Sequence, residues 1–273
     1  MVTREIRNFN LSQICRSGQC FRMREREEGI FSVIAGDRYV EIHQLGNLCK
    51  FQCSKEEFDD FWKSYFDLDE DYGRYVGQVK SEDTYLKAAA SYGEGIRILR
   101  QDLWEMIVSF LISQQNNIPR ICRCIENICE EYGEARINSR GETYYAFPRP
   151  EVLAELEEDA LKSCNLGYRS KYVVRSARSV LSGEIDLEKL FCKTYREARE
   201  ELLKLYGVGE KVADCICLFA LHQLEAFPVD THIRQALEEH YKEGSPVDRY
   251  EGIQGIMQQY IFYYESSGRH KPF

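Results

Sequence analysis

Residues 202–233, LLKLYGVGEKVADCICLFALHQLEAFPVDTHI, constrain the fold of this chain more than any other segment. They predict a helix, a tight turn at LYGVG, a second helix from about Glu210, a loop, and a third helix that begins after Asp230. Gly207 and Gly209 are expected to take positive φ and to leave backbone N–H groups pointing outward at a helix start. Such a helix start binds phosphate without needing a basic side chain.

Two functional groups flank this turn. Lys211 follows it directly, and Asp230 lies 19 residues further on in a Pro-Val-Asp run. Turn, lysine and aspartate together resemble the helix–hairpin–helix signature of base-excision DNA glycosylases, the HhH-GPD superfamily. GVGEKVADCICLFAL followed by AFPVDTHI is similar to the 8-oxoguanine DNA glycosylase branch in particular. The resemblance implies that Lys211 is the nucleophile and that Asp230 assists it.

The chemistry explains why a lysine is needed at such a site. Cleavage of an N-glycosidic bond passes through an oxocarbenium-like state, and a neutral amine can capture C1′ and expel the base. The resulting imine permits β-elimination of the 3′ phosphate, so glycosylase and lyase activities come together. Asp230 would stabilise the developing positive charge, and it could also cap the following helix. A plain solvated role for Lys211 at a helix end is the alternative.

Helical spacing places a pocket wall next to the lysine. Lys211, Cys215 and Phe219 recur every four residues and therefore share one helix face. By resemblance, Phe262 stacks on the purine opposite Cys215, and Gln258 reads its Watson–Crick edge. The family often has methionine near the position of Phe219, so an aromatic ring there is expected to reshape the pocket.

The segment SGQCFRM, residues 17–23, resembles the family segment in which a glycine carbonyl reads the lesion. 8-Oxoguanine carries a hydrogen-bond donor, N7–H, whereas N7 of guanine is an acceptor. A fixed carbonyl at Gly18 would attract the first base and repel the second.

Two loops resemble the family's DNA-separating loops. In SQQNNIPRI, Gln115 replaces the asparagine that fills the gap left by the extruded base, Asn116 and Asn117 follow it, and Arg120 matches the arginine that faces the orphaned cytosine. In NLGYRSKY, Tyr168 matches the residue that wedges between bases, and Arg169 the one that hydrogen-bonds that cytosine.

The remaining expected contacts lie around the hairpin. His232 either contacts the phosphate of the flipped nucleotide or is simply exposed at a helix start. Gly207 and Gly209 would contact phosphate through their amides. By resemblance, the carbonyls of Leu203, Leu205 and Val208 bind a monovalent or other structural cation.

The order of predicted elements indicates an α+β fold. The segment 30–42 predicts a β-hairpin that turns at Gly36-Asp37, and LCKFQC, residues 48–53, predicts a third strand. From about Tyr85 onward the pattern is helical. We therefore expect a small antiparallel β-rich N-terminal domain over residues 1–84 and a larger all-α helix–hairpin–helix glycosylase domain over 85–273.

Composition sets weaker limits. The 36 basic and 45 acidic residues give a net charge of −9, which argues against a typical nucleic-acid-binding protein. Charge is segregated, however: residues 54–72 hold eight acids against two lysines, and residues 161–178 hold five cations and no acid. One face could therefore still be positive. No apolar segment reaches the length of a membrane span, and the N-terminus lacks a signal peptide.

Eleven cysteines could indicate disulfides or a metal site. Their odd number and their positions in apolar helical runs favour free thiols in a reducing compartment. Cys49 and Cys53 lack the second pair that a zinc site needs. No cysteine follows Cys217, whereas glycosylases with an iron–sulfur cluster carry four after the aspartate helix. We expect no catalytic metal, no cluster and no other cofactor.

The sequence therefore predicts a monomeric, bifunctional 8-oxoguanine DNA glycosylase/lyase. Its substrate is expected to be double-stranded DNA with the lesion opposite cytosine, and its location the cytoplasm, or the nucleus of a eukaryote. Two alternatives remain. A monofunctional alkyl-base glycosylase would use Asp230 with water and should lack Lys211. A non-catalytic hairpin module would bind DNA through GVG alone.

Overall fold

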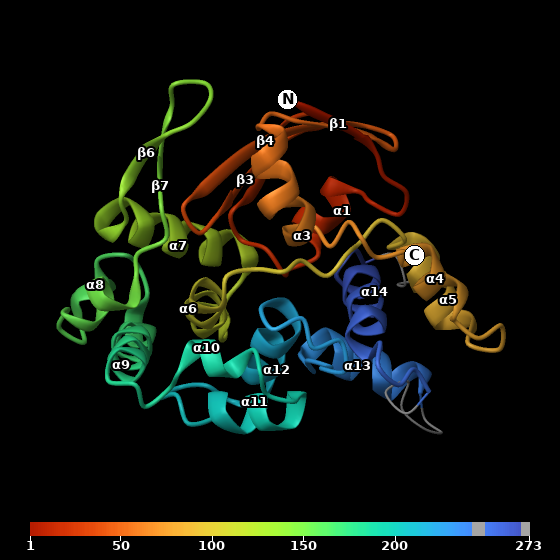
Figure 1. The fold of residues 1–273 in the computed structure, drawn as a ribbon. Helices are drawn as coiled ribbons and strands as arrows, with labels where there is room; N and C mark the ends of the chain where they lie inside the picture. The colour runs from red at the N-terminus through yellow and green to blue at the C-terminus, as the bar shows by residue number, and fades with distance from the viewer. Residues whose placement is uncertain (242–248, 269–273) are drawn as a thin grey trace.

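Five antiparallel strands form one sheet at the N-terminal end of the chain, and helices built from the rest lie against it (Figure 1). This computed structural model describes residues 1–241 and 249–268. The strands have the order β1-β5-β4-β3-β2. Their bounds are β1 Val2–Glu5, β2 Met23–Glu27, β3 Ile30–Ala35, β4 Arg38–Leu45 and β5 Leu48–Phe51.

The turn at Gly36-Asp37 fixes the register of the sheet. Ala35 pairs with Arg38 across it, as a two-residue hairpin requires, and Gly36 has φ +58°. Val33 pairs with Val40 two residues before Ala35, on the same face of the sheet as Ala35, and both valines are fully buried. The sheet thus turns an apolar face toward the interior, and its hairpin is the one that the sequence predicts.

Helices make up most of the remaining chain. Asp102, Asn117, Thr194 and Asp230 each accept a backbone N–H at the start of a helix, which satisfies a donor that the helix leaves unpaired. The helices are α1 Leu11–Arg16, α2 Lys55–Glu57, α3 Lys63–Tyr65, α4 Tyr72–Gly77, α5 Thr84–Tyr92, α6 Leu103–Ser113, α7 Ile118–Tyr132, α8 Pro150–Ala154, α9 Ser170–Leu181, α10 Leu187–Leu190, α11 Tyr195–Leu202, α12 Glu210–Phe219, α13 Thr231–His240 and α14 Gln254–Ser266. A π-helical turn, Phe58–Trp62, joins α2 to α3, and two 3₁₀ turns, Ala160–Lys162 and Gly167–Arg169, precede α9.

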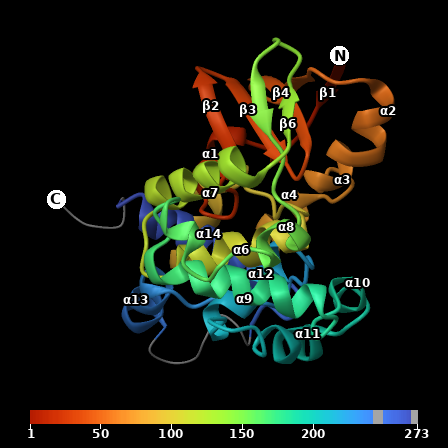
Figure 2. The same ribbon diagram turned by 90° about the vertical axis from the view of Figure 1, so that its left-hand side faces the viewer.

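The predicted fold class is confirmed, with some differences in detail. Strands β1 and β2 and helix α1 are not predicted from the sequence, because they are short and carry little periodic pattern. A second hairpin, β6 Ala135–Ile137 with β7 Thr143–Tyr145, lies inside the helical region and is also not predicted. Figure 2 shows this hairpin rising beside the sheet. None of the helices within residues 1–241 and 249–268 is long and apolar enough to cross a membrane.

Two hydrophobic cores lie on either side of the contact between sheet and helices. One consists of buried residues between positions 2 and 66 together with Leu99, and the other contains Phe21 and buried residues from Tyr72 onward. Short stretches of chain thus cross between the cores. The predicted boundary after residue 84 stays a prediction.

A buried ion pair joins the sheet to the helices. Arg22 follows the SGQCF segment and Glu105 lies in the first turn of α6, and their side chains are each only 7% exposed. Their charged atoms lie 3.4 Å apart. The Glu105 carboxylate also accepts the N–H of Gly36, and the Arg22 guanidinium donates to the carbonyls of Gly36 and Tyr145. One pair thereby fixes the β3–β4 turn, α6 and β7 relative to one another.

Removal of Glu105 should therefore destabilise the whole chain. We expect Glu105→Ala to lower the free energy of unfolding by about 3–5 kcal/mol, because it leaves the Arg22 charge buried without a partner. Urea denaturation measures this difference. Glu126→Ala is the control, since it removes an exposed ion pair with Arg24, which should contribute about 1 kcal/mol or less. Equal losses in the two variants would contradict the proposed role of the buried pair.

Candidate active site

The turn between α11 and α12 is the predicted hairpin. Gly207 has φ +93°, and a Cβ added there would lie 2.5 Å from the Tyr172 ring, so only glycine fits. The expectation of positive φ at Gly209 is wrong. This residue is extended, with φ −100° and ψ 177°, and precedes α12 as its N-cap. Nothing lies within 4 Å of a Cβ added to Gly209, so the missing side chain leaves the helix start open.

Side chains on both flanks hold the hairpin in place. Asp214 of α12 accepts hydrogen bonds from Tyr195 at 2.8 Å and from Arg199 at 2.7 Å, both on α11. Burial raises the pKa of the Asp214 carboxyl, although Tyr195 and Arg199 oppose that shift. On the other side, the Gln114 amide donates to the Gly207 carbonyl at 3.0 Å. The hairpin is therefore tied both to its own first helix and to the loop after α6.

Beside the hairpin lies a cavity of about 700 Å³. Its walls come from the segment after α1, the end of α6, the α6–α7 loop, α12, the start of α13, and α14. The sequence-predicted residues that line it are Gly18, Gln115, Asn116, Asn117, Lys211, Cys215, Phe219, Asp230, His232, Gln258 and Phe262. Residues that are far apart in the sequence thus line one cavity, as we expect from the sequence.

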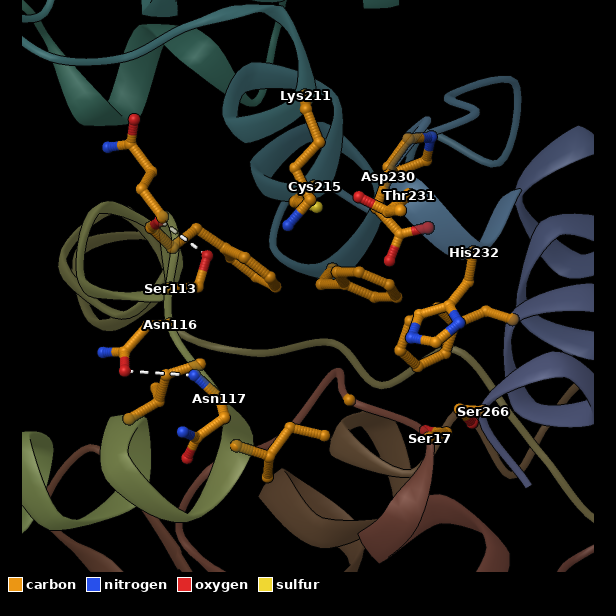
Figure 3. Close-up of a pocket in the computed structure, with 18 of the residues that line it drawn as sticks. Ser17, Ser113, Asn116, Asn117, Lys211, Cys215, Asp230, Thr231, His232 and Ser266 are labelled. Carbon is orange, nitrogen blue, oxygen red and sulfur yellow. Dashed lines mark hydrogen bonds between the residues drawn. The ribbon is translucent and has the colours of Figure 1, made fainter. Parts of the chain in front are cut away.

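Lys211 and Cys215 enter the cavity from the same face of α12 (Figure 3). The Lys211 Nζ lies 5.3 Å from the centroid of the Phe110 ring. Burial raises the pKa of the Cys215 thiol to about 11, and the neighbouring Lys211 charge only partly offsets this. Cys215 is therefore a neutral thiol at physiological pH and offers an apolar surface rather than a nucleophile.

Asp230 enters the cavity from the start of α13. One carboxylate oxygen accepts the backbone N–H of Ile233 at 2.8 Å, which is the capping interaction considered for this residue. Figure 3 shows Lys211 and Asp230 pointing into the same space from neighbouring elements. The cap limits the rotation of this carboxylate at the start of α13.

The opposite wall carries the expected base-reading groups. Gly18 has φ +74°, and a Cβ there would lie 2.9 Å from the Phe262 ring. Gln258 is buried, and its amide nitrogen donates to the Pro228 carbonyl at 3.0 Å. The exposed His232 ring meets Phe262 edge-to-face, with centroids 5.9 Å apart. Gly18, Phe262 and Gln258 therefore have little freedom to move.

Two aromatic residues of the wall were missed from the sequence. Phe110 stacks on Phe219 with centroids 5.6 Å apart and meets Phe21 edge-to-face at the same distance. Phe110 lies three residues before the SQQNN loop, and Phe21 lies three residues after Gly18. Only this closeness to the predicted motifs could have indicated from the sequence that the two rings line the cavity. The aromatic Phe219 thus extends an existing ring cluster.

The α6–α7 loop is strained at the position where the family carries asparagine. Gln115 has φ +48°, a conformation that asparagine adopts more readily than glutamine. The Arg169 side chain is buried and donates to the carbonyls of Gln114 and Gln115. It also donates to Leu166 at 3.3 Å. Arg169 therefore holds the loop in place through its guanidinium N–H groups. These are the same groups that, by resemblance, are expected to bind the orphaned cytosine.

The cations of residues 161–178 are mostly engaged by protein groups. Lys162 pairs with Asp159, Arg175 pairs with Glu158, and Arg178 donates to the carbonyls of Ala154 and Leu156. Lys162 and Arg175 are thus paired with carboxylates, whereas Arg178 donates to neutral carbonyls and keeps its positive charge. Tyr168 is 45% exposed and stacks with the Arg169 guanidinium, and Arg120 is exposed at the start of α7. Neither lines the cavity, so both lie at its rim or beyond.

No group of three or more His, Cys, Asp or Glu side chains within residues 1–241 and 249–268 could hold a metal ion. All eleven cysteines are free thiols. The expected cation ligands are backbone carbonyls in the hairpin. Among these, the Leu205 carbonyl accepts the N–H of Val208 at 3.0 Å, which leaves it one lone pair.

Two family sequence models together cover residues 1–254. Residues 1–107 match the 8-oxoguanine DNA glycosylase N-terminal domain, and residues 108–254 match the HhH-GPD superfamily of base excision DNA repair proteins. The fold also matches the crystal structure of an 8-oxoguanine glycosylase/lyase from Clostridium acetobutylicum, solved with double-stranded DNA containing cytosine opposite 8-oxoguanine. That match has a TM-score of 0.92 and 38% identity, and it covers 97% of this chain and 94% of the other.

Curated relatives agree with these matches. A probable N-glycosylase/DNA lyase of Methanothermobacter thermautotrophicus is 31% identical over 263 residues, with 84% of this chain and 82% of that protein covered. The N-glycosylase/DNA lyase of Saccharomyces cerevisiae is 36% identical over 160 residues. The match covers 55% of this chain and 43% of the yeast protein, so the chain spans less than half of the length of that relative.

The neutral state of Cys215 can be tested by alkylation. At pH 7.5 we expect iodoacetamide to label the exposed Cys192 rapidly and Cys215 very slowly, because the Cys215 thiol is buried and its pKa is about 11. Peptide mass mapping over time measures both rates in one sample. Labelling of Cys215 as fast as that of Cys192 would mean that the site holds a thiolate.

Proposed function

This chain belongs to the HhH-GPD superfamily of base excision DNA repair proteins, in its 8-oxoguanine glycosylase branch, and we propose that it is a bifunctional glycosylase/AP lyase that removes 8-oxoguanine from duplex DNA. The observation that carries this proposal is the placement of Lys211 and Asp230 in one cavity with Gly18 and Gln258. Nucleophile, carboxylate and base-reading groups then surround a single flipped nucleotide.

Lys211 is the nucleophile in the proposed reaction. Its neutral amine attacks C1′, the N-glycosidic bond breaks, and the base leaves with a proton. Opening of the sugar gives an imine between Lys211 and C1′, and loss of a proton from C2′ then expels the 3′ phosphate. Asp230 stabilises positive charge at the sugar during the first step. Its cap on α13 keeps the carboxylate from rotating away.

The opposite wall identifies the base. The Gly18 carbonyl accepts N7–H of 8-oxoguanine and repels the N7 lone pair of guanine. The purine lies between Cys215 and Phe262, where a neutral thiol and an aromatic ring offer apolar faces. Because Phe262 packs on Gly18, the carbonyl and the stacking ring are positioned together, and a displacement of one disturbs the other.

DNA is held mainly through backbone amides and a few side chains. The open start of α12 at Gly207 and Gly209 binds phosphate, and His232 contacts the phosphate of the flipped nucleotide. Gln115 enters the gap in the duplex, with Asn116 and Asn117 next to it in the loop, while Tyr168 wedges the neighbouring bases apart. The protein acts as a monomer in the cytoplasm or nucleus. Phosphate binding by amides is compatible with its net charge of −9.

A structural cation is a further part of this proposal. The carbonyls of Leu203, Leu205 and Val208 would hold a monovalent ion beside the phosphate, and three neutral oxygens suit such an ion better than a divalent one. The ion would add positive potential at the hairpin. The reaction itself is assigned to Lys211 and Asp230.

An alkyl-base glycosylase is the second candidate. Such an enzyme would activate water with Asp230 and would have no use for an amine at position 211. Lys211 lines the cavity beside Cys215, which favours the lyase. Trapping with borohydride separates the two candidates, because only the imine is reduced to a stable cross-link.

The nucleophile can be tested by substitution. We expect Lys211→Gln to reduce both base release and borohydride trapping by at least about 1,000-fold, because the amide cannot form an imine. Binding of an 8-oxoguanine duplex should change little. Gel-based excision, trapping and binding assays with the same duplex measure the three quantities. Lys204→Gln, which changes an exposed lysine, is the control and should behave like the unmodified protein. Normal trapping by Lys211→Gln would mean that another residue is the nucleophile.

The preference for the opposite base is a second test. Arg120 donates to N3 and O2 of the orphaned cytosine, whereas adenine presents a donor at N6. We therefore expect fastest excision opposite cytosine and a smaller difference among C, A, G and T in Arg120→Ala. Arg169→Ala should slow excision opposite all four bases, because it releases the loop that carries Gln115.

Single-turnover rates on the four duplexes distinguish these roles. Indifference of the unmodified protein to the opposite base would mean that Arg120 contacts phosphate only. If Arg169→Ala loses the preference for cytosine without a general loss of rate, Arg169 contacts the orphaned cytosine directly, as the sequence predicts.

A further inference from the structure

Three glutamine side chains form a buried row, and two of them, Gln258 and Gln259, line the cavity. Gln19, Gln259 and Gln258 are at most 3% exposed. The Gln19 amide nitrogen lies 3.3 Å from the Gln259 oxygen, and the Gln259 nitrogen donates to the Gln258 oxygen at 3.1 Å. The Gln258 nitrogen then donates to the Pro228 carbonyl at 3.0 Å. The row thus runs from the segment after α1, through α14, to the loop that ends at Asp230.

Backbone groups fix the polarity of this row at both ends. The Gln19 oxygen accepts the N–H of Leu99 at 2.9 Å. The two hydrogens of its nitrogen go to the Ser17 hydroxyl at 2.9 Å and the Arg97 carbonyl at 3.0 Å, so the longer 3.3 Å approach to Gln259 shares one of them. Neither backbone group can exchange donor for acceptor, so the Gln19 amide has only one orientation. The Pro228 carbonyl likewise requires a nitrogen from Gln258. An amide that turned over within the row would place two donors or two acceptors together.

Gln259 transmits this polarity to the base-reading residue. Its oxygen faces the Gln19 nitrogen, so its own nitrogen faces Gln258 and keeps the Gln258 oxygen on that side. Gln258 retains one hydrogen and one lone pair for a ligand, in a fixed order. Without Gln259, the Pro228 carbonyl alone would orient the Gln258 amide.

We propose that Gln259 is a specificity-determining positioning residue, which locks the Gln258 amide to match a purine with an acceptor at O6 and a donor at N1. This inference rests on the proposed function, in which Gln258 reads the flipped base. An adenine-type edge has a donor at N6 and an acceptor at N1, so it needs the reverse order. The row therefore selects oxidised guanine over oxidised adenine by orientation rather than by size.

The same row links both base-reading groups. Gln19 follows Gly18 directly, and its main-chain carbonyl accepts from the Gln101 side chain at 2.8 Å. Gln101 thereby holds the Gln19–Cys20 peptide, which directly follows the peptide that carries the Gly18 carbonyl. The Gly18 carbonyl, which reads N7–H, and the Gln258 amide, which reads the Watson–Crick edge, share one rigid frame.

Gln259→Leu and Gln259→Glu test the proposal. Leucine keeps the volume and removes both polar groups, whereas glutamate keeps the acceptor for Gln19 and removes the donor for Gln258. The substrates are duplexes with 8-oxoguanine or 8-oxoadenine, which both carry N7–H and differ at the Watson–Crick edge. A duplex with a preformed abasic site reports lyase activity without base recognition. Gln254→Leu, on the same helix, is the matched control.

Both Gln259 variants should lower the ratio of 8-oxoguanine to 8-oxoadenine excision by about tenfold, because the partner of a buried polar group is lost. Cleavage of the abasic duplex should stay at the level of the unmodified protein and of Gln254→Leu. An unchanged ratio overturns the proposal, and so does an equal loss on all three substrates, which indicates general damage. Lack of 8-oxoguanine excision by the unmodified protein would instead overturn the proposed function.

Discussion

Helix α12 is the constraint on which the rest of the site depends. Every residue from Val212 to Phe219 is buried, so the helix cannot rotate without opening the core. Asp214 binds α11 on one side, and the Phe219 carbonyl accepts from the Gln101 backbone at the other end. Lys211 directly precedes this buried segment and lies one turn before Cys215, and its side chain lines the cavity. The fixed helix also places its open start where phosphate can bind.

The cavity is lined by segments that are far apart in the sequence. Gly18 comes from the N-terminal region, Asp230 from the cap of α13, and Gln258 from α14. The Arg22–Glu105 pair and the glutamine row connect these parts through buried polar contacts, whose alternatives are costly. In the proposed function this cavity receives one flipped nucleotide, and backbone amides together with a small number of cations hold the DNA despite the net charge of −9.

Much of the site follows from local sequence, because helical spacing and turn chemistry act over short distances. Lys211, Cys215 and Phe219 could be placed on one face by their spacing of four, and Asp230 could be identified as a helix cap. The buried role of Arg169 could not be predicted, because it depends on where the strained Gln115 loop lies in space. Gln259 carried no signal either, since its partners come from two other segments.

The most direct test of this account is to identify the residue that is covalently trapped. The unmodified protein is incubated with an 8-oxoguanine duplex and borohydride, digested, and analysed by mass spectrometry. If Lys211 is the nucleophile, the reduced sugar adduct lies on the peptide that contains Lys211 and on no other lysine. An adduct on another lysine or on the terminal amine would contradict it. So would base release without any adduct, because that would mean that water rather than the amine attacks C1′.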